Sequence, residues 1–284
     1  MAYTINDAHL ALAYRVGETS VPTATSELAR RLDWFKVAIQ KASGGTELMW
    51  YMQKYATDTT VADQPTYSLP TRWRTFQQLK IDNYKYTQYP QEDIYEKFEL
   101  PNSPVPIQSI DIEYAFYVWA NEYYPIPIPG SAPTSFSVSS LTRSSTTATA
   151  TTSSAHGLIA GDHATIAGAT PSGYNGDQEI LTVPSTTTFT FTASSSLTTP
   201  ATGTITATER NIKQWYWEYP DLPTGTTSSI VVPDEYLDMI VAYAEGRYWS
   251  MAHKRGKASD AFMEFETRLN DMRAENTRKK FYAI

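Results

Sequence analysis

A segment of unusual composition interrupts this chain between Thr134 and Thr208. Nearly half of its residues are Ser or Thr, it holds no Lys and no Trp, and its only charged residues are Arg143, Asp162, Asp177 and Glu179. All seven Trp residues lie outside it. A fold that accepts a whole domain in one loop must close its own core on both sides of that loop. We therefore predict a discontinuous body, residues 1–132 and 209–284, and an inserted domain, residues 133–208.

The totals for the 284 residues limit the classes of function. A hydrophobic fraction of 41% predicts a folded protein, and a net charge of −7 argues against tight binding to a nucleic-acid backbone. Because the chain has no Cys, disulfides and thiolate chemistry are excluded. No apolar run is long enough for a signal peptide or a membrane span, so we expect neither secretion by that route nor contact with a membrane.

The charge is unevenly distributed along the chain. From Arg247 onward nine residues are basic (Arg247, Lys254, Arg255, Lys257, Arg268, Arg273, Arg278, Lys279 and Lys280) and five are acidic (Asp260, Glu264, Glu266, Asp271 and Glu275). An acidic body thus carries a basic tail. Two interpretations stay open: a solvated helix face, or a surface that docks onto an acidic partner.

Helical periodicity is clear near both ends of the chain. One apolar stripe consists of Leu28, Leu32, Phe35 and Ile39. It predicts a helix that Thr23 or Thr25 caps and that ends at Gly44 and Gly45. A shorter helix is predicted from Asp7, as its cap, to Arg15.

The C-terminal part predicts two long helices or one broken helix. Asp234 and Glu235 follow Pro233 in the first turn, where negative charge suits the helix dipole. Gly256 interrupts the apolar pattern that follows, and the pattern is lost from Thr277 to the end.

Two segments with the two-residue period of a strand flank the insert. They are residues 110–119 and 212–219, and we expect them to be antiparallel neighbours in one sheet. The Pro-rich segment 125–130 predicts a stiff extended spacer without ladder pairing. Residues 49–56 are consistent with either a helix end or a strand. The fold class is therefore α+β, a helical body with a small antiparallel sheet.

The insert itself predicts a small all-β domain. Short Thr-rich runs are separated by Gly, Asn, Asp and Pro, which are turn residues. The candidate inward residues are Leu158, Ile159, Ile166, Ile180, Leu181, Val183, Phe189, Phe191 and Ile205. They are enough for a β-sandwich or a small barrel. A disordered Ser/Thr linker is the alternative, but the apolar positions alternate regularly.

Several short sequence motifs of the insert are similar to those of a known module. Ala155-His156-Gly157-Leu158, Gly161-Asp162, Gly173-Tyr174-Asn175-Gly176 and Thr188-Phe189-Thr190-Phe191 resemble a β-module that recurs as an insertion or appendage in structural proteins of tailed bacteriophages. This resemblance covers most of the insert. It implies a viral structural protein.

The flanks resemble a second phage family. An N-terminal helical region, the phrase Tyr67-Ser68-Leu69-Pro70 before aromatic strands, and Val232-Pro233-Asp234-Glu235 opening a long helix are similar to head-to-tail adaptor proteins, also called connector or neck proteins. The family implies a ring of about twelve copies below the portal in the virion neck, which extends the DNA channel and provides a surface for tail docking. Such a protein is made in the host cytoplasm. Its partners are other copies of itself, the portal protein, a tail or stopper protein, and DNA that passes without specific binding.

This family assignment gives roles to named residues. A ring needs two different faces that meet, and Trp215, Trp217, Tyr248 and Trp249 are the predicted subunit contacts. The predicted portal-docking residues are Arg268, Arg273, Arg278, Lys279 and Lys280. An acidic lumen would repel DNA and let it slide.

Enzyme chemistry has weak support in the sequence. Asp111 and Glu113 share a strand face, as a glycosidase pair might, and Glu92, Asp93 and Glu96 lie nearby, but a solvated strand face explains the pair better. His156 and His163 with Asp162 are a weak metal candidate in turn positions. We predict no catalytic residue, no cofactor and no metal. The alternative function is a carbohydrate-binding or host-receptor-binding tail module, to which Trp215-Tyr216-Trp217 would contribute stacking surfaces.

Overall fold

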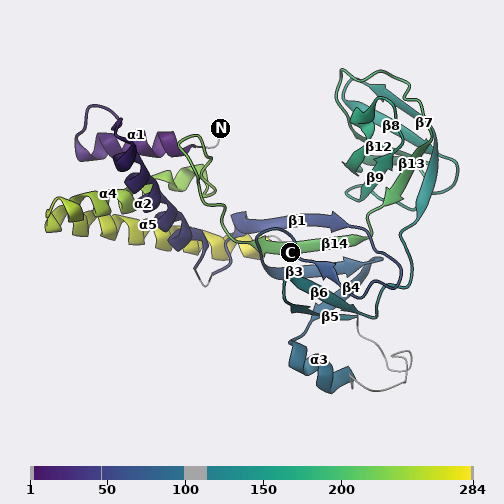
Figure 1. The fold of residues 1–284 in the computed structure, drawn as a ribbon, viewed down its shortest axis with the longest axis horizontal. Helices are drawn as coiled ribbons and strands as arrows, with labels where there is room; N and C mark the ends of the chain where they lie inside the picture. Colours follow the sequence, from purple (N-terminus) through teal and green to yellow (C-terminus); the bar gives the residue numbers. More distant parts are fainter. Residues whose placement is uncertain (1–2, 46, 99–113, 283–284) are drawn as a thin grey trace. The chain divides into compact units, whose positions relative to one another are not determined.

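The computed structural model describes residues 3–45, 47–98 and 114–282. Over these residues the protein is an α+β fold with five α-helices and two seven-stranded curled sheets, one mixed and one antiparallel (Figure 1). The chain divides into a helical unit, Met1–Lys54, Thr71–Thr75 and Tyr216–Ile284, and a β unit, Tyr55–Pro70 and Phe76–Trp215. This division falls elsewhere than the boundary expected from composition, because most of the strands that flank the insert group with it.

The first helix, α1, spans Ile5–Val16. Thr4 is its N-cap: the Thr4 hydroxyl accepts from the Asp7 amide, and the Asp7 carboxylate accepts from the Thr4 amide at 2.8 Å. The predicted helix is confirmed, but the predicted cap is wrong. Asp7 is the third residue of the helix and forms a capping box with Thr4. The helix ends at Gly17, whose φ of 81° suits a residue without a side chain.

The second helix, α2, spans Thr25–Ser43 and ends at Gly44, as its periodicity predicts. Its buried face includes Trp34, Phe35, Ala38, Ile39 and Ala42. The predicted threonine cap is wrong. Ala24 occupies the N-cap position and has no side chain that could accept a hydrogen bond from the first turn.

Two long helices end the described chain. After a single 3-10 turn, η3 (Asp234–Tyr236), α4 spans Leu237–Met251 and α5 spans Arg255–Tyr282. The break lies at His253, whose φ is 57°, and not at Gly256, which lies in the first turn of α5. Helix α5 continues past Thr277, where the apolar pattern ends.

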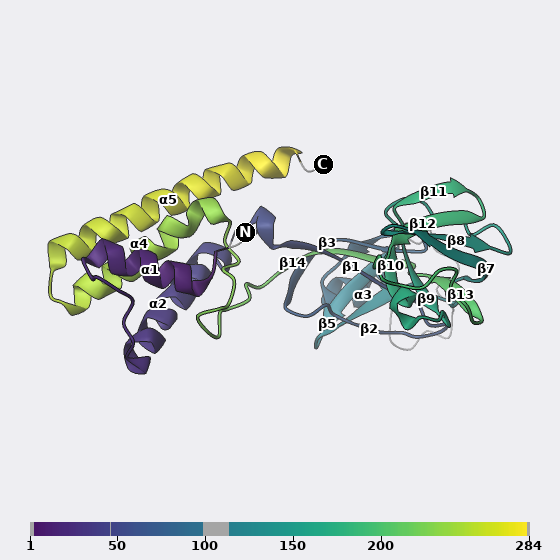
Figure 2. The same ribbon diagram turned by 90° about the horizontal axis from the view of Figure 1, so that it is seen from above.

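The core of the helical unit joins the two ends of the chain. Helix α4 packs against α1, α2 and α5, and Figure 2 shows α5 running along α4. The buried residues include Leu12, Phe35, Ile39, Ile240, Phe265 and Met272. Segments from residues 5–43 and 237–272 therefore share one apolar cluster.

The mixed sheet has the strand order β1-β14-β3-β4-β5-β6-β2. Its strands are β1 (Gln53–Asp58), β2 (Tyr67–Ser68), β3 (Trp73–Ile81), β4 (Tyr84–Gln88), β5 (Ala115–Trp119), β6 (Glu122–Ile126) and β14 (Ile212–Glu218). A single 3-10 turn, η1 (Trp50–Met52), precedes β1, and α3 (Gln91–Phe98) follows β4. The ambiguous segment 49–56 thus contains this turn and the start of a strand.

Three expectations about this sheet are wrong. It is mixed rather than antiparallel, because β4 and β5 run parallel. The strands before and after the insert share the sheet, but β14 lies between β1 and β3, and β5 lies between β4 and β6.

The Pro-rich spacer begins inside the sheet, since Pro125 of β6 pairs with Phe116. Strand β2 pairs only with Glu122 and Tyr123, which leaves an open edge at Pro125 where a residue without an N–H is tolerated. Residues 110–113 lie outside the described residues.

The insert forms the antiparallel sheet, and the all-β prediction is confirmed. The strand order is β10-β9-β13-β7-β8-β12-β11. The strands are β7 (Ser135–Ser144), β8 (Thr147–Thr152), β9 (His163–Ala167), β10 (Gly176–Glu179), β11 (Thr182–Ser185), β12 (Thr188–Thr192) and β13 (Ile205–Glu209), with the 3-10 turn η2 (Ser172–Tyr174) before β10.

Most of the residues predicted to point inward in the insert are buried. They are Leu158, Ile166, Ile180, Phe189, Phe191 and Ile205, while Val183 is partly buried. Ile159 and Leu181 are exposed instead. Phe189 and Phe191 of β12 pair in register with Ala150 and Ala148 of β8, so large side chains lie opposite small ones and fill the core.

Candidate functional site

Three of the five basic residues predicted to dock the portal form ion pairs within the chain. Arg268 pairs with Glu264 at 2.9 Å, Arg273 lies 3.9 Å from Glu47, and Lys279 pairs with Glu275 at 2.7 Å. The Lys279 ammonium also lies 4.3 Å from the centre of the Trp50 ring. No ion pair of Arg278 is seen among the described residues, and the side chain of Lys280 is not described. Surface pairs of this kind contribute up to about 1 kcal/mol, so a stronger partner can replace them.

An ion-pair network centred on Arg15 links the N-terminal helix to the C-terminal helices. The Arg15 guanidinium lies 3.0 Å from Glu264, 3.3 Å from Glu245 and 3.4 Å from Asp238. Burial alone would lower the pKa of Arg15, but the hydrogen bonds with Glu264 and Glu245 outweigh it and raise the pKa. The hydrogen bonds from Arg15 hold the pKa of Glu264 below its ordinary value. This network fixes the α1 end against α4 and α5.

Three of the four predicted subunit contacts pack within the helical unit. Trp217 packs against its core, and Tyr248 and Trp249 meet edge to face with ring centres 5.1 Å apart. Arg31 lies over the Tyr248 ring at 5.8 Å, and Lys257 lies over the Trp249 ring at 4.2 Å. These half-buried rings therefore already have intramolecular neighbours. Trp215, the fourth, lies in the β unit.

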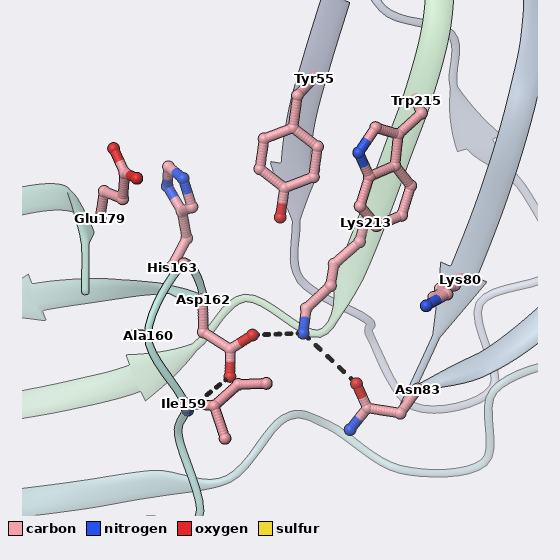
Figure 3. A pocket seen from close by; sticks show the side chains of 11 residues that line it. Tyr55, Lys80, Asn83, Ile159, Ala160, Asp162, His163, Glu179, Lys213 and Trp215 are labelled. Carbon is pink, nitrogen blue, oxygen red and sulfur yellow. Dashed lines mark hydrogen bonds and ion pairs between the residues drawn. The ribbon is translucent and has the colours of Figure 1, made fainter. Parts of the chain in front are cut away.

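Trp215 forms part of the wall of a pocket in the β unit, which we call the Trp215 pocket. Its volume is about 440 Å³. The mixed sheet contributes side chains from three adjacent strands and one turn, and the insert contributes the loop 159–163 and one residue of β10 (Figure 3). The volume falls in the range of about 300–1,000 Å³ that is typical of small-molecule sites.

A row of side chains from neighbouring strands forms the aromatic wall. The Tyr55 ring of β1 lies 4.9 Å from the Trp215 ring of β14 at an angle of 40°. The Lys80 ammonium of β3 lies 5.6 Å from the centre of the Trp215 ring, and the His163 ring lies 5.6 Å from Tyr55. Burial raises the pKa of Tyr55 to about 12, and the carboxylates of Asp162, Asp177 and Glu179 add to the shift. The Tyr55 hydroxyl is therefore protonated at neutral pH and can donate a hydrogen bond.

A buried ion pair forms the polar side of the pocket. Lys213 Nζ lies 2.5 Å from Asp162 Oδ1 and 3.3 Å from Asn83 Oδ1 (Figure 3). Asp162 Oδ2 accepts from the Ile159 amide at 2.9 Å, which fixes the loop over the ion pair. Both charged side chains are only 9% exposed. Because burying two charges costs several kcal/mol, the pair is stable only with these added hydrogen bonds.

A second polar cluster lies beside the pocket. His163 Nδ1 lies 2.9 Å from Asp177 Oδ1, and Arg210 Nε lies 3.5 Å from the other carboxylate oxygen. Arg210 Nε also donates to the Thr57 hydroxyl at 2.8 Å, so β1 and the insert share one network. The positive charge of Arg210 offsets the negative charge of Asp177.

The structure tests the weak metal candidates, but not the weak catalytic pair. Asp111 and Glu113 lie outside the described residues, and Glu92 and Asp93 lie on α3. His156 is buried, and its Nδ1 accepts from the Leu158 amide at 3.0 Å, while His163 pairs with Asp177. Within residues 3–45, 47–98 and 114–282, no three His, Asp or Glu side chains are arranged to hold a metal ion. In the same part of the chain, no helix has the length and apolar character needed to cross a membrane.

The sequence patterns single out Trp215 and Asp162, but they do not predict the pocket that these residues line. The alternation over 212–219 places Lys213 and Trp215 on one strand face, while the partner of Lys213 comes from an insert loop 51 residues away. No signal in the sequence relates that loop to the sheet. No protein-family model matches the chain, and no curated protein matches its sequence.

Proposed function

We propose that this chain is a virion structural protein, the head-to-tail adaptor of a tailed bacteriophage. In this proposal about twelve copies form a ring below the portal, extend the DNA channel and provide the surface to which the tail docks. The short sequence motifs of the insert and the order of elements in the flanking segments support this assignment to the adaptor family. The inserted sheet, as a β-sandwich-like or half-barrel decoration, would project from the ring.

The observation that carries the proposal is a pair of exposed apolar surfaces on two helices of the helical unit. On α1, Leu10 is 58% exposed and Tyr14 is 87% exposed. They are four residues apart and therefore lie on one helix face. On α5, Met263 is 60% exposed and lies beside Phe262 in a groove of about 430 Å³. Phe262 itself packs against Tyr243 of α4, with ring centres 5.6 Å apart, so the exposed part of the α5 surface is Met263.

Two unlike surfaces are what a closed ring requires. In a heterologous interface, one patch of a subunit meets a different patch of the next subunit, and a ring results when the rotation closes. Exposed apolar patches with polar rims are typical of such contacts. The α1 surface protrudes at Tyr14, while the α5 surface is a groove whose rim includes Glu266 and Asn270. We assign the first surface of one copy to the second surface of the next.

The charge distribution is compatible with a conduit. The chain carries a net charge of −7, and several C-terminal cations are paired with carboxylates. A surface without excess positive charge lets DNA pass without binding it. The paired cations remain available to an acidic portal surface, because exposed pairs exchange partners at small cost.

Native mass spectrometry of the full chain, alone and with the portal protein, tests the proposal. We expect a ring of about twelve subunits, at least in the presence of portal. The double variant Leu10→Ser/Tyr14→Ser and the single variant Met263→Ser should each abolish it. The matched control Ile128→Ser removes an exposed apolar side chain, 49% exposed, from the β unit and should leave the ring intact.

Mixing the two defective variants distinguishes a ring contact from a symmetric dimer contact. Each variant keeps one intact surface, so the mixture should form a heterodimer and stop there. Rings that persist in both variants, or labelling of this protein at a fibre tip of the virion, would contradict the proposal.

A further inference from the structure

Several polar atoms that line the Trp215 pocket have no hydrogen-bond partner in the part of the chain that the structure describes. Among the described residues, no hydrogen bond engages the Tyr55 hydroxyl, the Trp215 indole N–H, Asn83 Nδ2 or the Glu179 carboxylate. Three of these groups donate and one accepts, while the Tyr55 hydroxyl can do both. Unused donors and acceptors at the rim of a concave surface indicate a ligand that carries both kinds of group.

The charges of the pocket exclude a strongly anionic ligand. Lys213 is neutralised by Asp162 at 2.5 Å, and the remaining lysine, Lys80, faces a pocket that also contains Glu179. The neighbouring Asp177 is offset by Arg210. A phosphate or nucleotide site needs an excess of positive charge, which this balance does not provide.

The aromatic wall provides an apolar surface beside these polar atoms. Tyr55 is 38% exposed and leans on the partly exposed Trp215. The Lys80 ammonium covers part of the Trp215 ring, but a partly exposed cation–π contact is weak, so a ligand can displace it. A saccharide has an apolar C–H face and hydroxyl groups at its edge that both donate and accept. We infer that the Trp215 pocket binds a neutral saccharide.

In this assignment each residue has a distinct role. The Trp215 and Tyr55 rings pack against the C–H face of one sugar, while Asn83 Nδ2 and the Glu179 carboxylate bind hydroxyl groups at its edge. The buried Lys213–Asp162 pair holds the loop 159–163 in place and does not need to contact the sugar. The inference is independent of whether the protein forms a ring.

Saturation-transfer NMR and calorimetric titration of the full chain test the inference. The probes are maltotriose, galactose and tri-N-acetylchitotriose as neutral sugars, with glucuronic acid as the anionic comparison. We expect saturable binding of at least one neutral probe and weaker binding of glucuronic acid. Failure of all three neutral probes to bind at millimolar concentration, or a preference for glucuronic acid, would overturn the inference.

Matched variants localise the binding. Trp215→Ala should weaken binding by at least about tenfold, whereas Trp119→Ala, which removes an exposed tryptophan of β5 outside the pocket, should not change it. Should Trp215→Ala fail to fold, Asn83→Ser removes one exposed amide on the turn and should still weaken binding severalfold. Equal affinity of the wild type and the Asn83→Ser and Trp215→Ala variants would contradict the assignment.

Discussion

The helical unit and the inserted sheet both bury an apolar core, but they take the residues of that core from different parts of the chain. The core of the helical unit joins segments from both ends of the chain and is bordered by charges such as Arg15, whose partner Glu264 is 249 residues away. The insert holds a core of two Phe side chains opposite Ala, inside a surface of Ser and Thr that has few charges. One region depends on distant segments meeting, while the other is complete within about 75 residues. This difference predicts that removing a core side chain from one region unfolds that region and leaves the other folded.

The largest expected effect is the loss of a core ring from the insert. Phe189 is fully buried, so Phe189→Ala should destabilise by about 3–5 kcal/mol, which is comparable with the whole stability of a small domain. Hydrogen exchange measured by mass spectrometry should show lost protection over residues 135–209 and retained protection in α4 and α5. The matched variant Phe265→Ala should give the reverse pattern. Equal loss of protection in both regions would mean that the two unfold as one unit.

A buried charge at the edge of the insert should behave unlike the exposed charges of the helical unit. Lys213→Met leaves the Asp162 carboxylate buried without its cation, and should cost about 3 kcal/mol in urea unfolding. The double variant Asp162→Leu/Lys213→Met should recover most of this loss, because no unpaired charge remains. Arg268→Met, which removes the cation of an exposed pair, should cost less than about 1 kcal/mol. An equal cost for Lys213→Met and Arg268→Met would contradict this contrast.

Acid should weaken the helical unit through one histidine. His9 is buried against the edge of Phe35, and neither ring nitrogen has a hydrogen-bond partner among the described residues. Burial lowers its pKa to about 4, and the positive charge of Arg31 adds to the shift, while Glu27 opposes it. Because the unfolded chain binds a proton near pH 6.5 and the folded chain does not, stability falls as the pH drops from about 6.5 to about 4.

The size of this acid effect is set by the width of that pH window. We expect a loss on the order of 2–3 kcal/mol between pH 7 and pH 4 that the variant His9→Leu does not show. Thermal unfolding of both proteins across that range, monitored by the circular dichroism of the helices, gives the difference. A parallel pH dependence of the wild type and His9→Leu would assign the acid sensitivity to other groups.

The sequence predicts which local positions are buried in both regions. The stripe that ends at Ile39 and the inward side chains Phe189 and Phe191 follow from periodicity alone, because burial on one face repeats at a fixed spacing. Ile159 is exposed despite its type, because it lies in the loop that closes over the Lys213 ion pair.

Contacts between residues far apart in the chain could not be predicted from the local sequence pattern. The Arg15 network and the Lys213–Asp162 pair join residues far apart in the chain, so spacing carries no information about them. The order of the mixed sheet is a similar case: β14 enters between β1 and β3, although its sequence is adjacent to the insert. Trp215, predicted as a subunit contact, lines a pocket because an insert loop lies above its strand.

The smallest expected effect compares the starts of the two N-terminal helices. Thr4 caps α1 in a reciprocal pair with Asp7, whereas Ala24 begins α2 without a side-chain acceptor. Thr4→Ala should therefore destabilise the helical unit by about 1 kcal/mol, and Ala24→Ser should stabilise it by a similar amount. The backbone at Ala24 already has the extended conformation that a capping serine needs, with φ of −68° and ψ of 120°. Urea unfolding of the two single variants and of their combination measures both effects. The combined variant should return close to the wild-type stability, since the caps lie on different helices and their contributions add; a gain at Ala24 that disappears when Thr4 is replaced would show instead that the two helix starts are coupled.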